Sequence, residues 1–345
     1  MEKFKDLVIT DLENLVEELL EKTRTDMGVS VKDFQELFKK NNEIFDIVDS
    51  TLSEFIISLQ NTDYIDDWRT KSNINQGVIM NEHKAMFLYY FMFVNAAFVV
   101  FNRIKDALNK TTIDISDLIP ICILGTLARM SDEIGTLLSV GATKAALSAW
   151  RSFYDHAVIG MFLMTKDSPD LYKKFADYSH RDVKRKKDFF DKHREELKFP
   201  VMEDERSAAI SERTEALKEQ YGADFFKDYN WAKDYLSVRP TFLAIEEEAG
   251  MSRYRSFYIW ASDYMHPNFN AMANFNEDEK VILDKIIEPV LEKESFIDPM
   301  QLTLGIFTGF LNLFLHKYSL DHQYATNMKV FNQLFKKMSA EFSPG

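Results

Sequence analysis

The sequence predicts an all-α protein, a multi-helix bundle with a central buried helix and a peripheral N-terminal helical layer. Turn formers are scarce, with 11 Gly and 8 Pro in 345 residues, and apolar residues recur at helical spacing over long stretches. One stretch, residues 142–166, is apolar or small nearly all round, which is typical of a helix inside a core. Hydrophobic residues make up 46% and charged residues 28%, which is ordinary for a globular protein.

The first sixty residues predict the N-terminal layer. Residues 4–24, 30–38 and 44–60 place apolar side chains along one helical face and polar side chains opposite, as in a peripheral layer or a dimerisation arm. Residues 61–80 break the periodicity and predict a connection. We therefore expect an N-terminal helical layer over residues 1–60 and a helical core domain over residues 81–345.

The core domain begins with a long apolar helix over residues 81–109. Its apolar stretch, residues 85–101, is slightly shorter than the roughly 20 residues that a membrane span needs, and it contains Asn95. We therefore expect a core helix and no membrane span. The N-terminus has no apolar run followed by a cleavage site, so no signal peptide is predicted.

The remaining elements follow from periodicity and capping. A helix over residues 116–138 is expected to be capped by Ser116 or Asp117, and the central helix follows it. Pro169 starts a new helix, because proline is tolerated in a first turn. Further helical segments are expected at residues 171–198, 208–220, 254–266, 277–292 and 299–318, with a final helix to about residue 338, and residues 231–250 are expected to pack against the core.

Charge and cysteine content limit the function classes. The net charge of −13 disfavours general nucleic-acid binding, although a local basic patch is still able to act. Segment 181–198 is such a patch, with eight Lys/Arg against five Asp/Glu, and predicts either a solvated helix or an RNA-facing edge. The single cysteine, Cys122, cannot form an intrachain disulfide, which favours a reducing cytoplasm.

The polar residues of the central helix are the first candidate site. Arg151 and Asp155 are four residues apart and therefore share one helical face, where burial makes pairing necessary. His156 is five residues from Arg151, a rotation of about 140° on an ideal helix, so it faces another neighbour.

A second polar stripe follows about a hundred residues later. Tyr254, Tyr258, Ser262 and His266 recur every four residues, and such a face is able to hydrogen-bond to a buried Arg–Asp pair. His266 precedes a proline, which predicts a position at or next to a helix C-terminus. The helix dipole there favours its protonated form.

No cofactor or metal site is predicted. Asp263 and His266 resemble half of a helical metal site, but Asp263 is off the polar stripe and no Glu-x-x-His pair accompanies them. The sequence also lacks a phosphate-binding glycine-rich loop, a Gly-x-Ser-x-Gly elbow and paired cysteines with zinc spacing.

These stretches resemble a widespread bacterial family of unknown function over roughly residues 110–275. Its pattern is a small-residue helix with Arg-x-x-x-Glu, a tryptophan-containing segment and a Tyr-x-x-x-Ser-x-x-x-His helix. Asp155 stands where the family usually has Glu, which shortens the reach to its partner. The matching residues are Arg151, Trp231, Tyr258, Ser262 and His266.

The segment from Arg151 to His156 also resembles the HEPN superfamily, all-helical ribonucleases of bacterial defence and toxin systems. The family motif is Arg, four to six residues, then His. The resemblance implies that the Arg and His act on the RNA phosphate and 2′-hydroxyl without a metal, usually across a dimer.

Two functional hypotheses follow. The first is a metal-independent ribonuclease effector in defence or toxin activity, in which Arg151 stabilises phosphate charge and His156 or His266 is the acid–base residue. The second is a non-enzymatic helical scaffold or small-anion sensor, in which the Arg–Asp–Tyr–His network is structural or binds an anion. Either way, we expect a cytoplasmic homo-oligomer.

Overall fold

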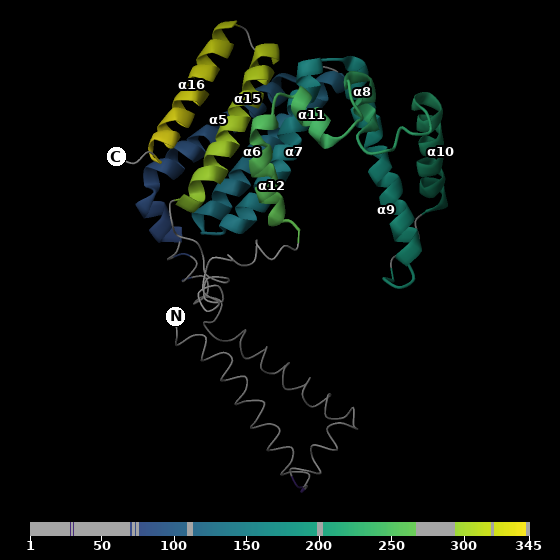
Figure 1. The fold of residues 1–345 in the computed structure, drawn as a ribbon, viewed down its shortest axis with the longest axis horizontal. Coiled ribbons are helices and arrows are strands. Elements are labelled where there is room, and N and C mark those ends of the chain that lie inside the picture. Colours follow the sequence, from purple (N-terminus) through teal and green to yellow (C-terminus); the bar gives the residue numbers. More distant parts are fainter. Residues whose placement is uncertain are drawn as a thin grey trace. The chain divides into compact units, whose positions relative to one another are not determined.

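The computed structural model describes residues 76–108, 113–198, 203–266, 294–318 and 321–342, together with Gly28, Ser30, Thr70 and Asn73. The chain divides into two compact units, Met1–Ser72 and Asn73–Gly345, and every element below belongs to the second unit. The described residues contain helices and no strand, which confirms the all-α prediction (Figure 1). The predicted helices over residues 1–60 and 277–292 lie outside the described residues.

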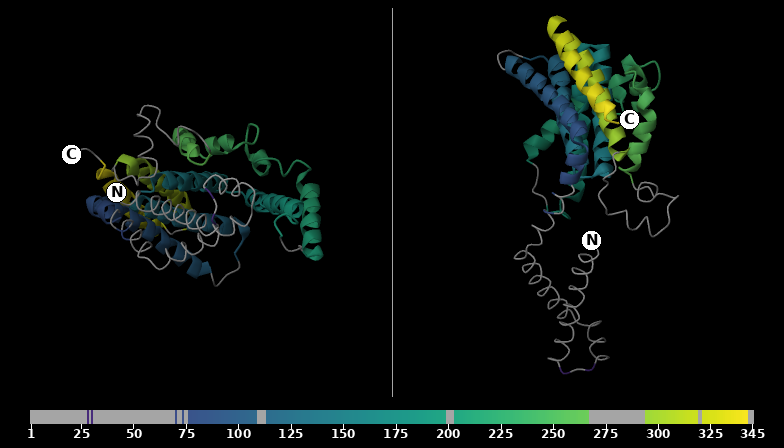
Figure 2. Two further views of the ribbon diagram at one scale, coloured as in Figure 1. Left: turned by 90° about the horizontal axis from the view of Figure 1, so that it is seen from below. Right: turned by 90° about the vertical axis from the view of Figure 1, so that its left-hand side faces the viewer.

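Five long helices form the bundle. The central one, α7, packs against α6 and α15, and α5 packs against α6 and α16 (Figure 1). The right-hand view of Figure 2 shows α16 lying alongside α5. These helices are α5 (Lys84–Leu108), α6 (Ile115–Ser139), α7 (Thr143–Lys166), α15 (Glu294–Tyr318) and α16 (Asp321–Ala340).

The central helix is confirmed within one residue of the predicted start. Large side chains such as Trp150, Phe153 and Phe162 are fully buried, so α7 contributes to the core on more than one face. Gly160 allows α6 and α15 to approach α7 closely, because a Cβ there would lie 2.8 Å from Ile123 on α6 and from Phe310 on α15. The helix ends where Asp167 adopts a left-handed conformation with φ 41°.

Shorter elements follow α7 in the chain. They are α8 (Pro169–Tyr178), α9 (His180–His193), α10 (Asp204–Tyr221), the 3₁₀ helix η1 (Asn230–Tyr235), α11 (Phe242–Glu248), the 3₁₀ helix η2 (Ser252–Tyr254) and α12 (Arg255–Asp263). Both α11 and α12 pack against α7. Trp231 in η1 is buried between the rings of Phe162 and Phe175.

Two local predictions were wrong. The charged stretch 171–198 is two helices rather than one: the chain breaks at Ser179, whose hydroxyl bonds to the Ala176 carbonyl at 2.6 Å and competes with the helical pattern. The N-cap of α6 is Asp114 rather than Ser116 or Asp117, because the Asp114 carboxylate accepts a bond from the Ser116 amide at 2.9 Å.

One helix of the described residues, Lys84–Ala107, is long and apolar enough to cross a membrane by length and composition alone. Core helices pass the same test, and α5 supplies fully buried residues such as Phe87, Tyr90 and Phe93 to the bundle. However, only 39% of its most apolar window is buried, so α5 also has an apolar face outside the core.

Candidate functional site: the Arg151 cluster

The predicted Arg151–Asp155 pair is present and joins α7 to α12. Arg151 Nε donates a hydrogen bond to Ser262 Oγ at 3.0 Å, and the other two guanidinium nitrogens bond to Asp155 and to the Tyr258 hydroxyl. All three guanidinium nitrogens are thus engaged within the chain. We call Arg151, Asp155, Tyr258 and Ser262 the Arg151 cluster.

The two helices run antiparallel along this contact. Ser148, one turn before Arg151, donates to the Tyr264 carbonyl at 3.3 Å, so the contacts move down α12 as they move up α7. The Ser262 hydroxyl is itself fixed, because it donates to the Tyr258 carbonyl at 2.7 Å. The seam between α7 and α12 is therefore polar, although most of α7 is apolar.

Aromatic rings hold the guanidinium in place. The Arg151 guanidinium carbon lies 3.7 Å from the centroid of the Tyr258 ring, which is a cation–π contact, and Tyr258 also stacks on Phe242 at 5.3 Å. A second guanidinium, that of Arg255, lies 4.6 Å from the same centroid. One tyrosine ring thus contacts two cations.

The second cation belongs to a buried network that sequence reasoning missed. Glu246 on α11 is fully buried and accepts bonds from the Tyr154 hydroxyl at 2.6 Å and from Arg255 at 3.3 Å. Tyr154 immediately precedes Asp155 in α7. The sequence offers a weak indication that Glu246 faces inward, because it lies four residues after Phe242 on the same helical face. It is the first of three consecutive glutamates, however, and such a run usually indicates an exposed segment.

The cluster is partly open to solvent. The side chain of Arg151 is 16% exposed and that of Asp155 is 38% exposed. Burial raises the pKa of Asp155, and the Arg151 cation opposes this shift without cancelling it. Burial also raises the pKa of the Tyr258 hydroxyl. Asp155 is therefore a partner of Arg151 that solvent can reach and whose carboxylate is protonated more easily than an ordinary one.

Neither histidine joins the cluster. His156 is exposed, and its Nδ1 lies 2.8 Å from the Ser152 carbonyl of the same helix, as its rotation from Arg151 predicts. His266 is exposed beyond the end of α12, which confirms its predicted place near a helix C-terminus. Its backbone amide bonds to the Ser262 carbonyl at 3.2 Å, so it lies one turn from the cluster.

The predicted four-residue stripe is therefore only half correct. Tyr258 and Ser262 reach Arg151, whereas Tyr254 belongs to the 3₁₀ turn η2 and contacts the ring of Tyr154 at 6.4 Å instead. The change from 3₁₀ to α-helix at Arg255 rotates Tyr254 away from the ideal periodicity. Within the described residues, no group of three His, Cys, Asp or Glu is positioned to hold a metal ion.

Tyr229 adds a strained residue beside the cluster. Its φ of 57° is left-handed, which is uncommon for a large side chain, and its ring lies 6.1 Å from that of Phe242. Burial raises the pKa of Tyr229, and the charge of Asp155 adds to this effect. The sequence before Trp231 gives no sign of this conformation.

Comparison with known proteins finds a match to a family of unknown function. No curated protein and no solved structure shows a significant match to the chain. Residues 117–282 match the model of a family of unknown function, DUF5677, and the matched region contains the whole Arg151 cluster. The predicted similarity to an uncharacterised family is therefore confirmed for the segment that runs from α6 past α12.

Proposed function

We propose that this protein is a non-enzymatic helical scaffold in which the Arg151 cluster fastens α12 to α7 and binds a small oxyanion. The observation that supports this proposal best is the arrangement of partners around Arg151. Tyr258 and Ser262 hold the guanidinium from α12, while the third partner, Asp155, is partly exposed. A guanidinium presents donors in a planar fork that matches an oxyanion.

Protonation of Asp155 would allow an external oxyanion to replace this carboxylate beside Arg151. A partly buried carboxylate with a raised pKa takes up a proton more readily than a fully exposed one. Protonated Asp155 releases one side of the Arg151 guanidinium, and an external oxyanion then replaces it as the counter-charge. Anion binding is thereby coupled to proton uptake, and it acts directly on the α7–α12 contact.

Sulfate is a suitable probe, because its charge does not change near neutral pH. We expect sulfate to raise the melting temperature of the native protein more than that of the Arg151→Gln variant, with an excess that grows as the pH falls. The excess grows because a protonated Asp155 no longer competes with sulfate for Arg151. The same raised pKa also gives the folded chain a pH dependence of its own: this carboxyl contributes stability at acid pH that is lost as the pH rises through its raised pKa. Thermal melts at several pH values measure the excess.

Two variants sharpen this test. Sulfate also stabilises proteins by exclusion from their surface, and Arg151→Gln retains that general effect. Asp155→Asn removes the competing charge, so it should increase the sulfate response and abolish the pH dependence of the excess. Equal sulfate responses in the native protein and in Arg151→Gln at every pH would exclude an anion site at Arg151.

A metal-independent ribonuclease is the second candidate function. It is favoured by His266, which is exposed one turn from Ser262, and by α9, where Arg185, Lys186 and Lys192 make no ion pair with any described residue. Phe189, 59% exposed, lies among these cations, and basic side chains interleaved with an aromatic ring suit single-stranded RNA. The resemblance of Arg151 and His156 to the HEPN motif points to the same activity.

Incubation of the purified protein with total RNA in EDTA tests the ribonuclease candidate. Cleavage that is lost in Arg151→Ala and in His266→Ala would support it, and loss in His156→Ala would assign the acid–base role to the HEPN-like histidine. Arg185→Gln with Lys186→Gln should also weaken cleavage, whereas the control Lys184→Gln with Lys187→Gln should leave it unchanged, because Asp188 and Asp191 already pair with these lysines. Absence of cleavage, or cleavage unchanged in Arg151→Ala, would reject this candidate.

A further inference from the structure

An apolar stripe runs along the solvent side of α5. Leu88, Met92 and Val99 are 51%, 47% and 42% exposed, although α5 is a core helix on its opposite side. With the exposed Asn95 and Asn102, these residues follow intervals of four, three, four and three. This is the spacing by which one helix packs against another in a coiled coil. We call these five residues the α5 stripe.

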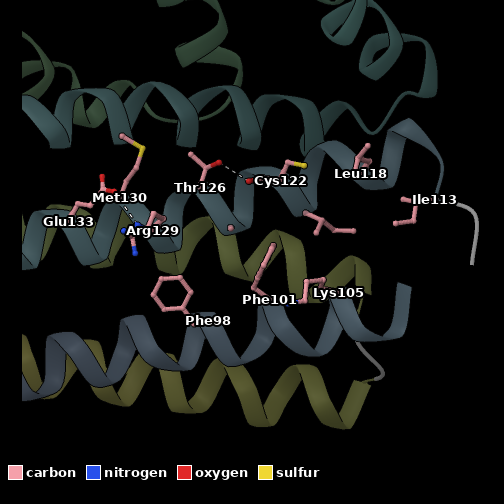
Figure 3. A pocket seen from close by; sticks show the side chains of 12 residues that line it. Phe98, Phe101, Lys105, Ile113, Leu118, Cys122, Thr126, Arg129, Met130 and Glu133 are labelled. Atoms are coloured by element: carbon pink, nitrogen blue, oxygen red, sulfur yellow. Dashed lines mark hydrogen bonds and ion pairs between the residues drawn. The ribbon is translucent and has the colours of Figure 1, made fainter. Parts of the chain in front are cut away.

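A groove lies next to the α5 stripe and extends the apolar surface. It has a volume of about 600 Å³ and lies between α5 and α6 (Figure 3). Phe98 and Phe101 line it from α5, and Leu118, Cys122 and Met130 line it from α6. The Phe101 ring packs directly on Gly125 of α6, where an added Cβ would lie only 2.7 Å from the ring.

The stripe and the groove share α5, where Phe98 of the groove lies between Asn95 and Val99 of the stripe in the sequence, and Lys105, Arg129 and Glu133 also line the groove. Single exposed apolar side chains are normal on protein surfaces, whereas contiguous apolar patches mark interaction sites. A helix of the length of α5, 25 residues, extends for about 37 Å. Its exposed face is therefore long enough to pair with a second helix of similar length.

We infer that the α5 stripe is the contact face of a homodimer in which α5 packs antiparallel against α5 of a second copy. The distribution of charge along the helix identifies the partner. The exposed Lys84 precedes Asn95 by eleven residues, and the exposed Asp106 follows it by eleven. A twofold axis at Asn95 places Lys84 of each copy beside Asp106 of the other copy.

The same symmetry pairs the rest of the stripe. Met92 and Val99, three residues before and four residues after Asn95, lie within one residue of facing each other across the axis, and Leu88 faces Asn102 of the other copy. The two Asn95 side chains face each other, and a polar residue in an apolar seam fixes register and oligomeric state. A parallel pairing would instead place Lys84 against Lys84 and align the two helix dipoles unfavourably.

Sedimentation of the full chain tests the dimer. We expect a dimer for the native protein and a monomer for the double variant Met92→Glu with Val99→Glu, because each charge would be buried in the seam. Leu243→Glu is the matched control: Leu243 is an exposed apolar residue on α11, outside the stripe, and this variant should remain dimeric. Circular dichroism verifies that each variant is folded.

Disulfide trapping tests the arrangement, in a Cys122→Ser background. Asn95→Cys should form a covalent dimer under mild oxidation, and so should Lys84→Cys combined with Asp106→Cys, whereas Lys84→Cys alone should not. Covalent dimers from Lys84→Cys alone would overturn the antiparallel register. A native protein that is monomeric at high concentration would overturn the dimer, as would binding to phosphatidylcholine vesicles that the double variant abolishes, because the face would then be a membrane contact.

Discussion

Replacing Glu246 with alanine is expected to lower the free energy of unfolding by about 3 kcal/mol, the lower end of the range for removing one partner of a buried ion pair, because the remaining Arg255 is 34% exposed. Glu246 is fully buried, and it accepts hydrogen bonds from Tyr154 and Arg255. Its loss leaves the Tyr154 hydroxyl with the Met251 carbonyl as its acceptor, at 3.1 Å, and leaves part of the Arg255 guanidinium without an acceptor. Urea unfolding followed by circular dichroism measures the change.

Glu248 is the matched control within the same helix. It also forms an ion pair, with Lys166 at 2.6 Å, but its side chain and that of Lys166 are both partly exposed. Glu248→Ala should therefore cost no more than about 1 kcal/mol. If the two variants lost similar amounts of unfolding free energy, burial would not be what makes the Glu246 interactions stabilising.

Replacing Gly160 with valine is expected to destabilise the bundle by about 3 kcal/mol, near the upper end of the usual cost of overpacking a core. The first added atom would already lie 2.8 Å from the side chains of Ile123 and Phe310, which belong to two different helices. Neither neighbour is able to retreat without disturbing the packing of α7 against α6 and α15. Chemical denaturation gives the magnitude.

Gly305 is the control for this substitution, because it lies in the interior of α15 with room for a side chain. The nearest atom to an added Cβ is on Phe335, at an ordinary 3.5 Å. Gly305→Ala should therefore keep or raise stability, since alanine is favoured over glycine in a helix interior by about 1 kcal/mol. A tolerated Gly160→Val, or a strongly destabilising Gly305→Ala, would contradict the assigned packing.

The sequence by itself determined the helical class, the central helix and the Arg151–Asp155 pair. All three depend on local periodicity: apolar residues on every face of residues 142–166 require a core position, and two residues four apart on one helix are neighbours in any helical fold. His156 was separated from the pair by the same geometry, and its position confirms that reasoning.

Only the tertiary structure decided which distant residues complete the cluster and which faces stay free. Tyr258 and Ser262 reach Arg151 because α12 packs antiparallel on α7, while Glu246 is buried because α11 also covers α7. In α5 nearly every face is apolar, so periodicity cannot distinguish the side that faces the core from the side that bears Leu88, Met92 and Val99. The physical reason is the same in both cases: helical spacing fixes neighbours within one helix, whereas the choice of partner helix depends on packing between different segments of the chain.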